Sequence, residues 1–267
     1  MRRKITMILA LLLMLAGLGV LTYPALSDYI SRRNGSYAIQ LLDNRMEGIQ
    51  EKVLERQREL AAEYNARLGA GETDGLDAEY EKIMDFGGGI MGYIRIPEIR
   101  VKLPIYHGVE EDVLAKGVGH LPRTAFPIGG AGNHTVLSGH TGLPSAELFT
   151  GLTELEIGDC FYITALEDTL AYQVDQIRVV LPNEVGALSP VAGADYCTLV
   201  TCTPYGINSH RLLVRGSRVP MEQEVPELRQ QEQNSQNPRI PGVLIIAAAT
   251  AAGILIRMLF LILGRKR

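Results

Sequence analysis

Three polar residues of this chain combine the side chains that thiol-based acyl transfer requires, and each lies at the end of an apolar run. Cys202 ends the run that begins at Thr198, His140 follows the run that ends at Ser138, and Arg211 begins the next apolar run. A thiol nucleophile needs a group that manages its proton, and histidine is the usual one. Arginine can stabilise a developing oxyanion because it keeps its positive charge. The three together predict a site for acyl transfer.

The other cysteines and histidines have simpler interpretations. Cys160 and Cys197 lie within strand-like apolar runs, and we expect them to be small buried residues. His107, His120 and His210 are expected in turns or on the rim of the fold. The spacings Cys-x2-Cys and His-x3-His, typical of zinc sites, do not occur, so no metal or cofactor is expected.

The middle of the chain has the pattern of a mainly β protein. From residue 90 to about residue 219, short alternating or apolar runs are separated by glycine and proline. About eight strands of this kind predict a closed or nearly closed barrel, rich in antiparallel pairs. The clearest runs are residues 93–96, 101–106, 134–138, 170–174, 177–181, 198–201 and 211–214.

The segment before the barrel has helical periodicity. From Ser27 to about Ala70, apolar residues recur mostly at spacings of three and four, which predicts an amphipathic helical segment packed on the following domain. A polar, glycine-containing loop follows from Gly69 to Asp77. Residues 80–85 are expected to form a short helix.

Both ends of the chain are apolar enough to lie in a bilayer. Residues 5–21 follow three basic residues and would rise about 26 Å as a helix, within the spanning range. A cleaved signal peptide is the alternative, because it has the same basic and apolar parts. Residues 240–263 form the second block, interrupted by Arg257, which lies near enough to the end to reach the membrane surface.

Basic residues flank both apolar blocks on their terminal sides. The positive-inside rule therefore places both termini in the cytoplasm and the barrel outside, on a two-helix membrane protein. Net charge is −4, so no nucleic-acid partner is expected. The expected division is an anchor at 1–26, a helical segment and lid-like loop at 27–89, a barrel at 90–219, a polar stalk at 220–239 and a helix with a basic tail at 240–267.

The longest motif surrounds the cysteine and the arginine. Residues 198–214, TLVTCTPYGINSHRLLV, resemble the active-site signature of class C, pilin-polymerising sortases. Four further segments match that family in the expected order: GYIRIP at 92–97, LPIYHG at 103–108, GVGHL at 117–121 and LSGHTGLP at 137–144.

This resemblance implies an eight-stranded sortase barrel and a cysteine transpeptidase. Cys202 would attack an LPxTG-like sorting signal to form a thioacyl-enzyme, and a lysine amine of a pilin subunit would resolve it. His140 would serve as general acid and then as base, and Arg211 would hold the substrate carbonyl and its oxyanion. The implied partners are sorting-signal proteins, pilins among them, and the lipid bilayer.

One feature departs from the class C pattern. Such enzymes usually carry a lid with an Asp-Pro-aromatic motif, whereas this chain has no proline between Pro24 and Pro97. Two alternatives to pilin polymerisation stay open. One is a sortase that anchors surface proteins to peptidoglycan, and the other is a non-catalytic, membrane-anchored surface module.

Overall fold

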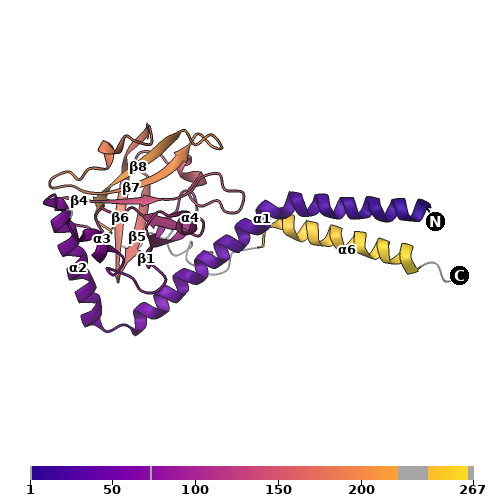
Figure 1. The fold of residues 1–267 in the computed structure, drawn as a ribbon, viewed down its shortest axis with the longest axis horizontal. Helices are drawn as coiled ribbons and strands as arrows, with labels where there is room; N and C mark the ends of the chain where they lie inside the picture. Colours follow the sequence, from indigo (N-terminus) through magenta and orange to yellow (C-terminus); the bar gives the residue numbers. More distant parts are fainter. Residues whose placement is uncertain (1, 73, 222–239, 264–267) are drawn as a thin grey trace.

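The computed structural model describes residues 2–72, 74–221 and 240–263, and it shows a β-barrel joined to long helices (Figure 1). Most of the expected stalk and the basic tail lie outside the described residues. The helical elements are α1 (Arg2–Gly48), α2 (Glu51–Gly69), α3 (Leu76–Tyr80), α4 (Glu111–Leu114), η1 (Thr150–Glu154), η2 (Val185–Leu188) and α6 (Gly242–Leu263). The strands are β1 (Ile90–Ile96), β2 (Val101–His107), β3 (Val118–His120), β4 (Asn133–Ser138), β5 (Cys160–Ala165), β6 (Asp168–Val180), β7 (Asp195–Thr203) and β8 (His210–Val219).

The eight strands close into a barrel in the order β1-β2-β3-β4-β7-β8-β6-β5. Neighbouring strands are antiparallel except for β2 with β3 and β4 with β7, which are parallel. The predicted eight-stranded, mainly antiparallel barrel is therefore confirmed. The parallel pair β4–β7 joins strands that are far apart in the sequence, and it determines how the site is assembled.

Alternation along β7 and β8 separates a core face from an outer face. Cys197 and Leu199 of β7 and Leu212 and Val214 of β8 are buried in the main apolar core. Successive side chains of a strand point to opposite faces of the sheet. Cys202, an odd number of positions from Cys197 and Leu199, therefore lies on the outer face of the barrel.

The strand β6 differs from the sequence expectation. Residues 170–174 and 177–181 were expected to be two strands, but one strand, Asp168–Val180, contains most of both, and its register shifts between Val174 and Gln176. An extra residue at a bulge shifts the alternation of the strand, so one bulged strand has the sequence pattern of two short ones. Asp175, at the irregularity, forms a two-point ion pair with Arg215 of β8.

The N-terminal helix is longer than either of the two parts expected for it. α1 continues from the apolar block through Pro24 to Gly48 without a break at residue 26. α6 lies beside its apolar half (Figure 1). The Lys4 amine donates to the carbonyl of Leu261. Both helices are long and apolar enough to cross a membrane.

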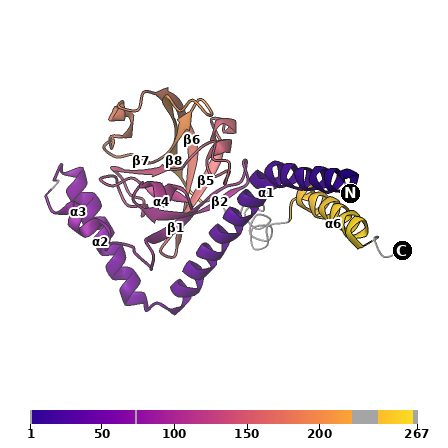
Figure 2. The same ribbon diagram turned by 45° about the vertical axis from the view of Figure 1, so that its right-hand side comes forward.

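The second half of α1 and one face of α2 pack against the barrel, and the two helices form a V beside it (Figure 2). Ile39 and Leu42 of α1 are buried, as is Tyr64 of α2. Asn65 fixes α2 to the barrel, because its amide both donates to and accepts from the backbone of Phe126. The predicted packing of this helical segment on the following domain is confirmed.

The predicted short helix at residues 80–85 is wrong, because α3 ends at Tyr80. The carboxylate of Asp85 accepts hydrogen bonds from the amides of Gly87 and Gly89, and this local bonding favours a turn. The helix α3 is fixed to the β3–β4 connection, where Arg123 forms a two-point ion pair with Asp77.

Candidate active site

Cys202 and Arg211 face each other across the β7–β8 ladder. They are direct partners in the antiparallel register, and Thr203 is paired with His210 at the next position. Residues directly opposite in such a pair point to the same face, with Cβ atoms about 5 Å apart. The thiol and the guanidinium therefore share the outer face at one end of the barrel.

The parallel pairing of β4 with β7 brings His140 to the same end. Ser138 is the register partner of Val200, so His140 lies two positions beyond β4 just as Cys202 lies two positions beyond Val200. The amide of Gly139 donates to the Val200 carbonyl at 3.0 Å, and the Thr201 hydroxyl donates to the Gly139 carbonyl at 2.7 Å. All three predicted site residues thus meet at one end of β4, β7 and β8.

The Nε2 atom of His140 lies near a carboxylate but forms no hydrogen bond among the described residues. Its side chain is 21% exposed, and Nε2 lies 3.5 Å from a carboxylate oxygen of Glu111 on α4. Among the residues that the structure describes, Nε2 is buried and has no hydrogen-bond partner. Glu111 was not predicted from the sequence, because nothing in the run Glu110–Asp112 distinguishes it from a solvated acidic turn.

Arg211 is held from one side by the loop between β7 and β8. Its Nη1 donates to the carbonyl oxygens of Asn208 at 3.2 Å and His210 at 3.0 Å. The loop is itself closed, because the amides of Ile207 and Asn208 donate to the Pro204 carbonyl. Since a guanidinium is planar, fixing one nitrogen restricts the direction in which the others can donate.

The three cysteines have different environments, and all three are free thiols. Cys197 is fully buried in the core, and burial raises its pKa well above the ordinary value. Burial also raises the pKa of Cys160 on β5. Because the thiolate is the nucleophilic form, neither of these is suited to attack a carbonyl. Cys202 is partly exposed.

Two histidines expected in turns or on the rim are buried instead. His107 ends β2, and its ring nitrogens contact the carbonyls of Gly89 and Ile83. His120 is fully buried, with the Tyr80 hydroxyl 2.9 Å from its Nδ1. These residues join α3 and its following turn to the barrel, a structural role that their positions in the sequence do not reveal.

Comparisons with known proteins agree with the fold and the grouping of these residues. The family model of the Sortase domain matches residues 94–219. The crystal structure of sortase C1 from Streptococcus agalactiae is 44% identical, with a TM-score of 0.67, over 70% of this chain and 100% of that one. Sortase C from Clostridium perfringens SM101 is 40% identical, with a TM-score of 0.63, over 69% of this chain and 99% of that one.

A more distant relative is Sortase A of Streptococcus agalactiae serotype III, 25% identical over 73% of this chain and 77% of its own length. The fold and these matches define the class of protein as a cysteine transpeptidase. The chain belongs to the sortase family, and its likeness to sortase C structures supports class C within it.

Proposed function

We propose that Cys202 is the nucleophile of this transpeptidase and that its substrate is an LPxTG-like sorting signal. The observation that carries the proposal is the strand register, which pairs Cys202 with Arg211 and brings His140 to the same level. The Cys202 thiol gives its proton to His140 as the sulfur attacks the carbonyl carbon of the Thr–Gly amide, and the C–N bond then breaks. His140 gives a proton to the leaving amine, and the acyl group stays on sulfur as a thioester.

Arg211 stabilises the negative charge that develops on the carbonyl oxygen during this attack. Its Nη1 already donates to the carbonyls of Asn208 in the loop and His210 at the start of β8, so the guanidinium is preorganised rather than recruited from solvent. An amine then attacks the thioester carbon and loses a proton to His140. The C–S bond breaks, an amide forms and the thiol is regenerated.

We propose that the resolving amine is a lysine side chain of a pilin subunit, which gives an isopeptide bond between subunits. Similar solved structures support this choice: one is sortase C1 of GBS Pilus Island 1, and another is a pilus-related sortase C of Group B Streptococcus. A third, sortase C of Streptococcus pneumoniae, is a structure described as giving insight into pilin substrate specificity.

We further propose that α1 and α6 cross the membrane with both termini in the cytoplasm and the barrel outside. The contact of Lys4 with Leu261 supports a hairpin, because it joins the start of α1 to the end of α6. Basic residues lie in the first turn of α1 and follow α6 in the sequence, which are the two ends on that side.

Mass spectrometry of the full-length protein with an LPxTG-type peptide tests the nucleophile. The expected product is an acyl adduct on Cys202 that hydroxylamine removes, whereas Cys202→Ala gives no adduct and Cys160→Ala gives the normal one. An adduct that persists in Cys202→Ala contradicts the assignment. Adding a lysine-containing pilin peptide or a peptidoglycan-type amine then distinguishes pilin polymerisation from cell-wall anchoring, and the absence of any adduct favours the non-catalytic module.

A further inference from the structure

The loop that follows His140 is closed at His140 itself. β4 ends at Ser138, and the next helical element, η1, begins at Thr150. Between them, the amide of Phe149 donates to the carbonyl of His140 at 3.0 Å. This hydrogen bond joins the two ends of the loop, and the backbone of His140 is one of those ends. A contact that fixes this loop therefore also restrains the histidine.

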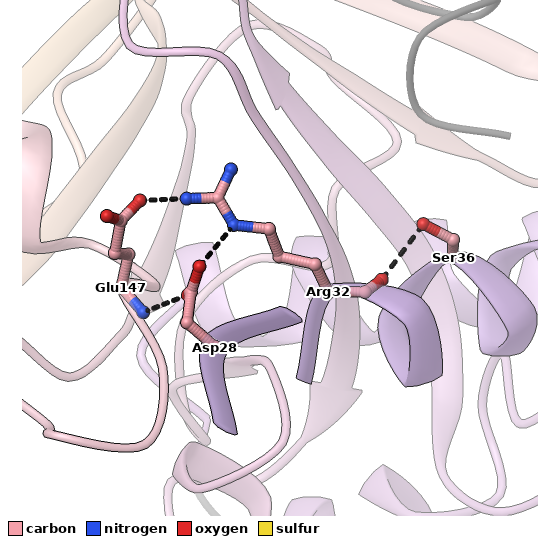
Figure 3. A network of polar contacts seen from close by, with 4 residues as sticks. All are labelled: Asp28, Arg32, Ser36 and Glu147. Carbon is pink, nitrogen blue, oxygen red and sulfur yellow. Dashed lines mark hydrogen bonds and ion pairs between the residues drawn. The ribbon is translucent and has the colours of Figure 1, made fainter. Parts of the chain in front are cut away.

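A cluster of charged groups attaches this loop to the helix α1 (Figure 3). One carboxylate oxygen of Asp28 accepts the backbone amide of Glu147 at 2.9 Å, and the other accepts Nε of Arg32 at 2.7 Å. Arg32 also donates to the carboxylate of Glu147. We call Asp28, Arg32 and Glu147 the clasp. It holds the main chain of the loop, because Asp28 binds an amide nitrogen.

The two clasp residues on α1 are held in place by the helix and by its packing on the barrel. Asp28 and Arg32 are one turn apart on α1, and the hydroxyl of Ser36 donates to the carbonyl of Arg32 at 2.9 Å (Figure 3). One and two turns further along, Ile39 and Leu42 are buried against the barrel. The same helix is continuous with the apolar span at its start, so the clasp connects the membrane anchor directly to the loop of the histidine.

The exposure of the clasp indicates a local role. The side chains of Asp28, Arg32 and Glu147 are 20%, 45% and 68% exposed. Ion pairs this exposed add little to global stability. They can still order a surface loop, because local opening is governed by the few contacts of the segment itself. Misplacing a reacting group by about 1 Å can lower a rate by about 10²-fold.

We propose that Asp28 and Arg32 are positioning residues for His140. They act through Glu147 and through the hydrogen bond between Phe149 and His140 that closes the loop. The proposal rests on the proposed transpeptidase function and adds α1 to the residues that assemble its site. A helix that anchors the enzyme thereby also fixes the general acid and base relative to the nucleophile on β7.

Steady-state kinetics of the full-length protein in nanodiscs, with an LPxTG-type peptide and an amine acceptor, test the proposal. Asp28→Ala is expected to lower kcat about tenfold, with KM changed less than about twofold, because the chemical step depends on placement of His140. The matched control is Arg58→Gln, which breaks an exposed ion pair between α2 and Asp168 at the start of β6. It is expected to leave kcat unchanged. Equal effects of the two substitutions overturn the proposal.

Charge reversal separates positioning from general damage. Arg32→Glu and Glu147→Arg are each expected to lower kcat, and the double variant is expected to regain part of it, because the opposite-charge pair between positions 32 and 147 is restored while Asp28 still lacks its cationic partner. If the double variant is as slow as the worse single variant, the pair does not position the loop.

Hydrogen exchange measured on the same nanodisc samples gives a readout that needs no substrate. Asp28→Ala is expected to speed exchange of the amides of residues 142–149 and to leave the thermal unfolding temperature unchanged. If the exchange rates in this loop do not change, the proposal that the clasp orders the loop is wrong, whether or not the peptide is turned over. Failure of the clasp is thus distinguishable from failure of the transpeptidase assignment, which shows as the absence of any acyl adduct in the wild-type protein.

Discussion

At the scale of the residue, β7 carries two cysteines whose environments differ because an odd number of positions separates them along the strand. Cys197 and Cys202 are five positions apart, so they point to opposite faces of the strand. The first is enclosed by the barrel core and keeps its proton, since burial raises its pKa. The second reaches the outer face beside Arg211. Two chemically identical side chains thus lie in different environments because they point in opposite directions.

The preorganised guanidinium leads to a prediction about Arg211. Arg211→Ala is expected to slow thioester formation by about 10²-fold, the scale of losing an oxyanion donor. Arg211→Lys should be intermediate, because it keeps the charge but loses the planar set of donors bound to the loop carbonyls. Single-turnover kinetics measure this step. The exposed Arg218 on the same strand supplies the control, and an equal loss in Arg218→Ala would argue for a general charge effect.

Burial of His120 leads to a prediction about pH. Desolvation lowers the pKa of His120 from 6.5 to about 4, so the folded protein keeps this imidazole neutral where the unfolded chain protonates it. The contribution of His120 to the free energy of unfolding is fully present above pH 6.5. It is lost as the pH falls toward 4, by about 3 kcal/mol in total. Burial lowers the pKa of His134 as well, which adds to the same trend.

Urea denaturation at several pH values between 4 and 7 measures this effect. Subtracting the curve of His120→Gln from that of the wild-type protein isolates the contribution of His120 from those of His134 and the carboxylates. A difference that does not change with pH would show that His120 does not remain neutral in the folded state.

At the scale of the element, the end of β4 places the histidine, and a glycine lets it approach its neighbours. A Cβ atom at Gly139 would lie 2.6 Å from the ring of Phe149, closer than real contacts allow. Gly139→Ala is therefore expected to displace either the ring or the end of β4, with about 1–3 kcal/mol of destabilisation and a loss of kcat.

A second glycine provides the matched control for this substitution. A Cβ at Gly186 in η2 meets nothing within 4 Å, so Gly186→Ala should change neither stability nor kcat. Thermal unfolding and peptide turnover of both variants are the measurements. Normal turnover by Gly139→Ala would mean that the β4 end is less constrained than the structure indicates.

At the scale of the whole molecule, α1 has two functions along its length, since its first half lies beside α6 and its second half packs on the barrel. Deleting residues 240–267 should leave the unfolding temperature of the barrel nearly unchanged. Deleting residues 1–49 should lower it by about 10 °C, because Ile39 and Leu42 are lost from the core at about 2 kcal/mol each. Calorimetry in detergent compares the two truncations, and equal shifts would contradict this division of α1.

The sequence alone determined much of the chemistry and the class of fold. The types and spacing of His140, Cys202 and Arg211 indicated acyl transfer, and the surrounding motifs indicated the family. Short alternating runs indicated an eight-stranded barrel, and the length and composition of the two end blocks indicated membrane helices. These signals are local, because each depends on neighbours a few positions away along one strand or helix.

Only the tertiary structure decided which of these pieces meet. The pairing of β4 with β7, which sets His140 level with Cys202, joins residues that are 62 positions apart. The clasp joins Asp28 to Glu147, 119 positions away, and no periodicity in either segment indicates it. The burial of His120 beneath Tyr80 and the continuity of β6 through its bulge follow likewise from barrel closure. Such contacts depend on which distant segments the folded chain brings side by side, which local sequence preferences do not specify.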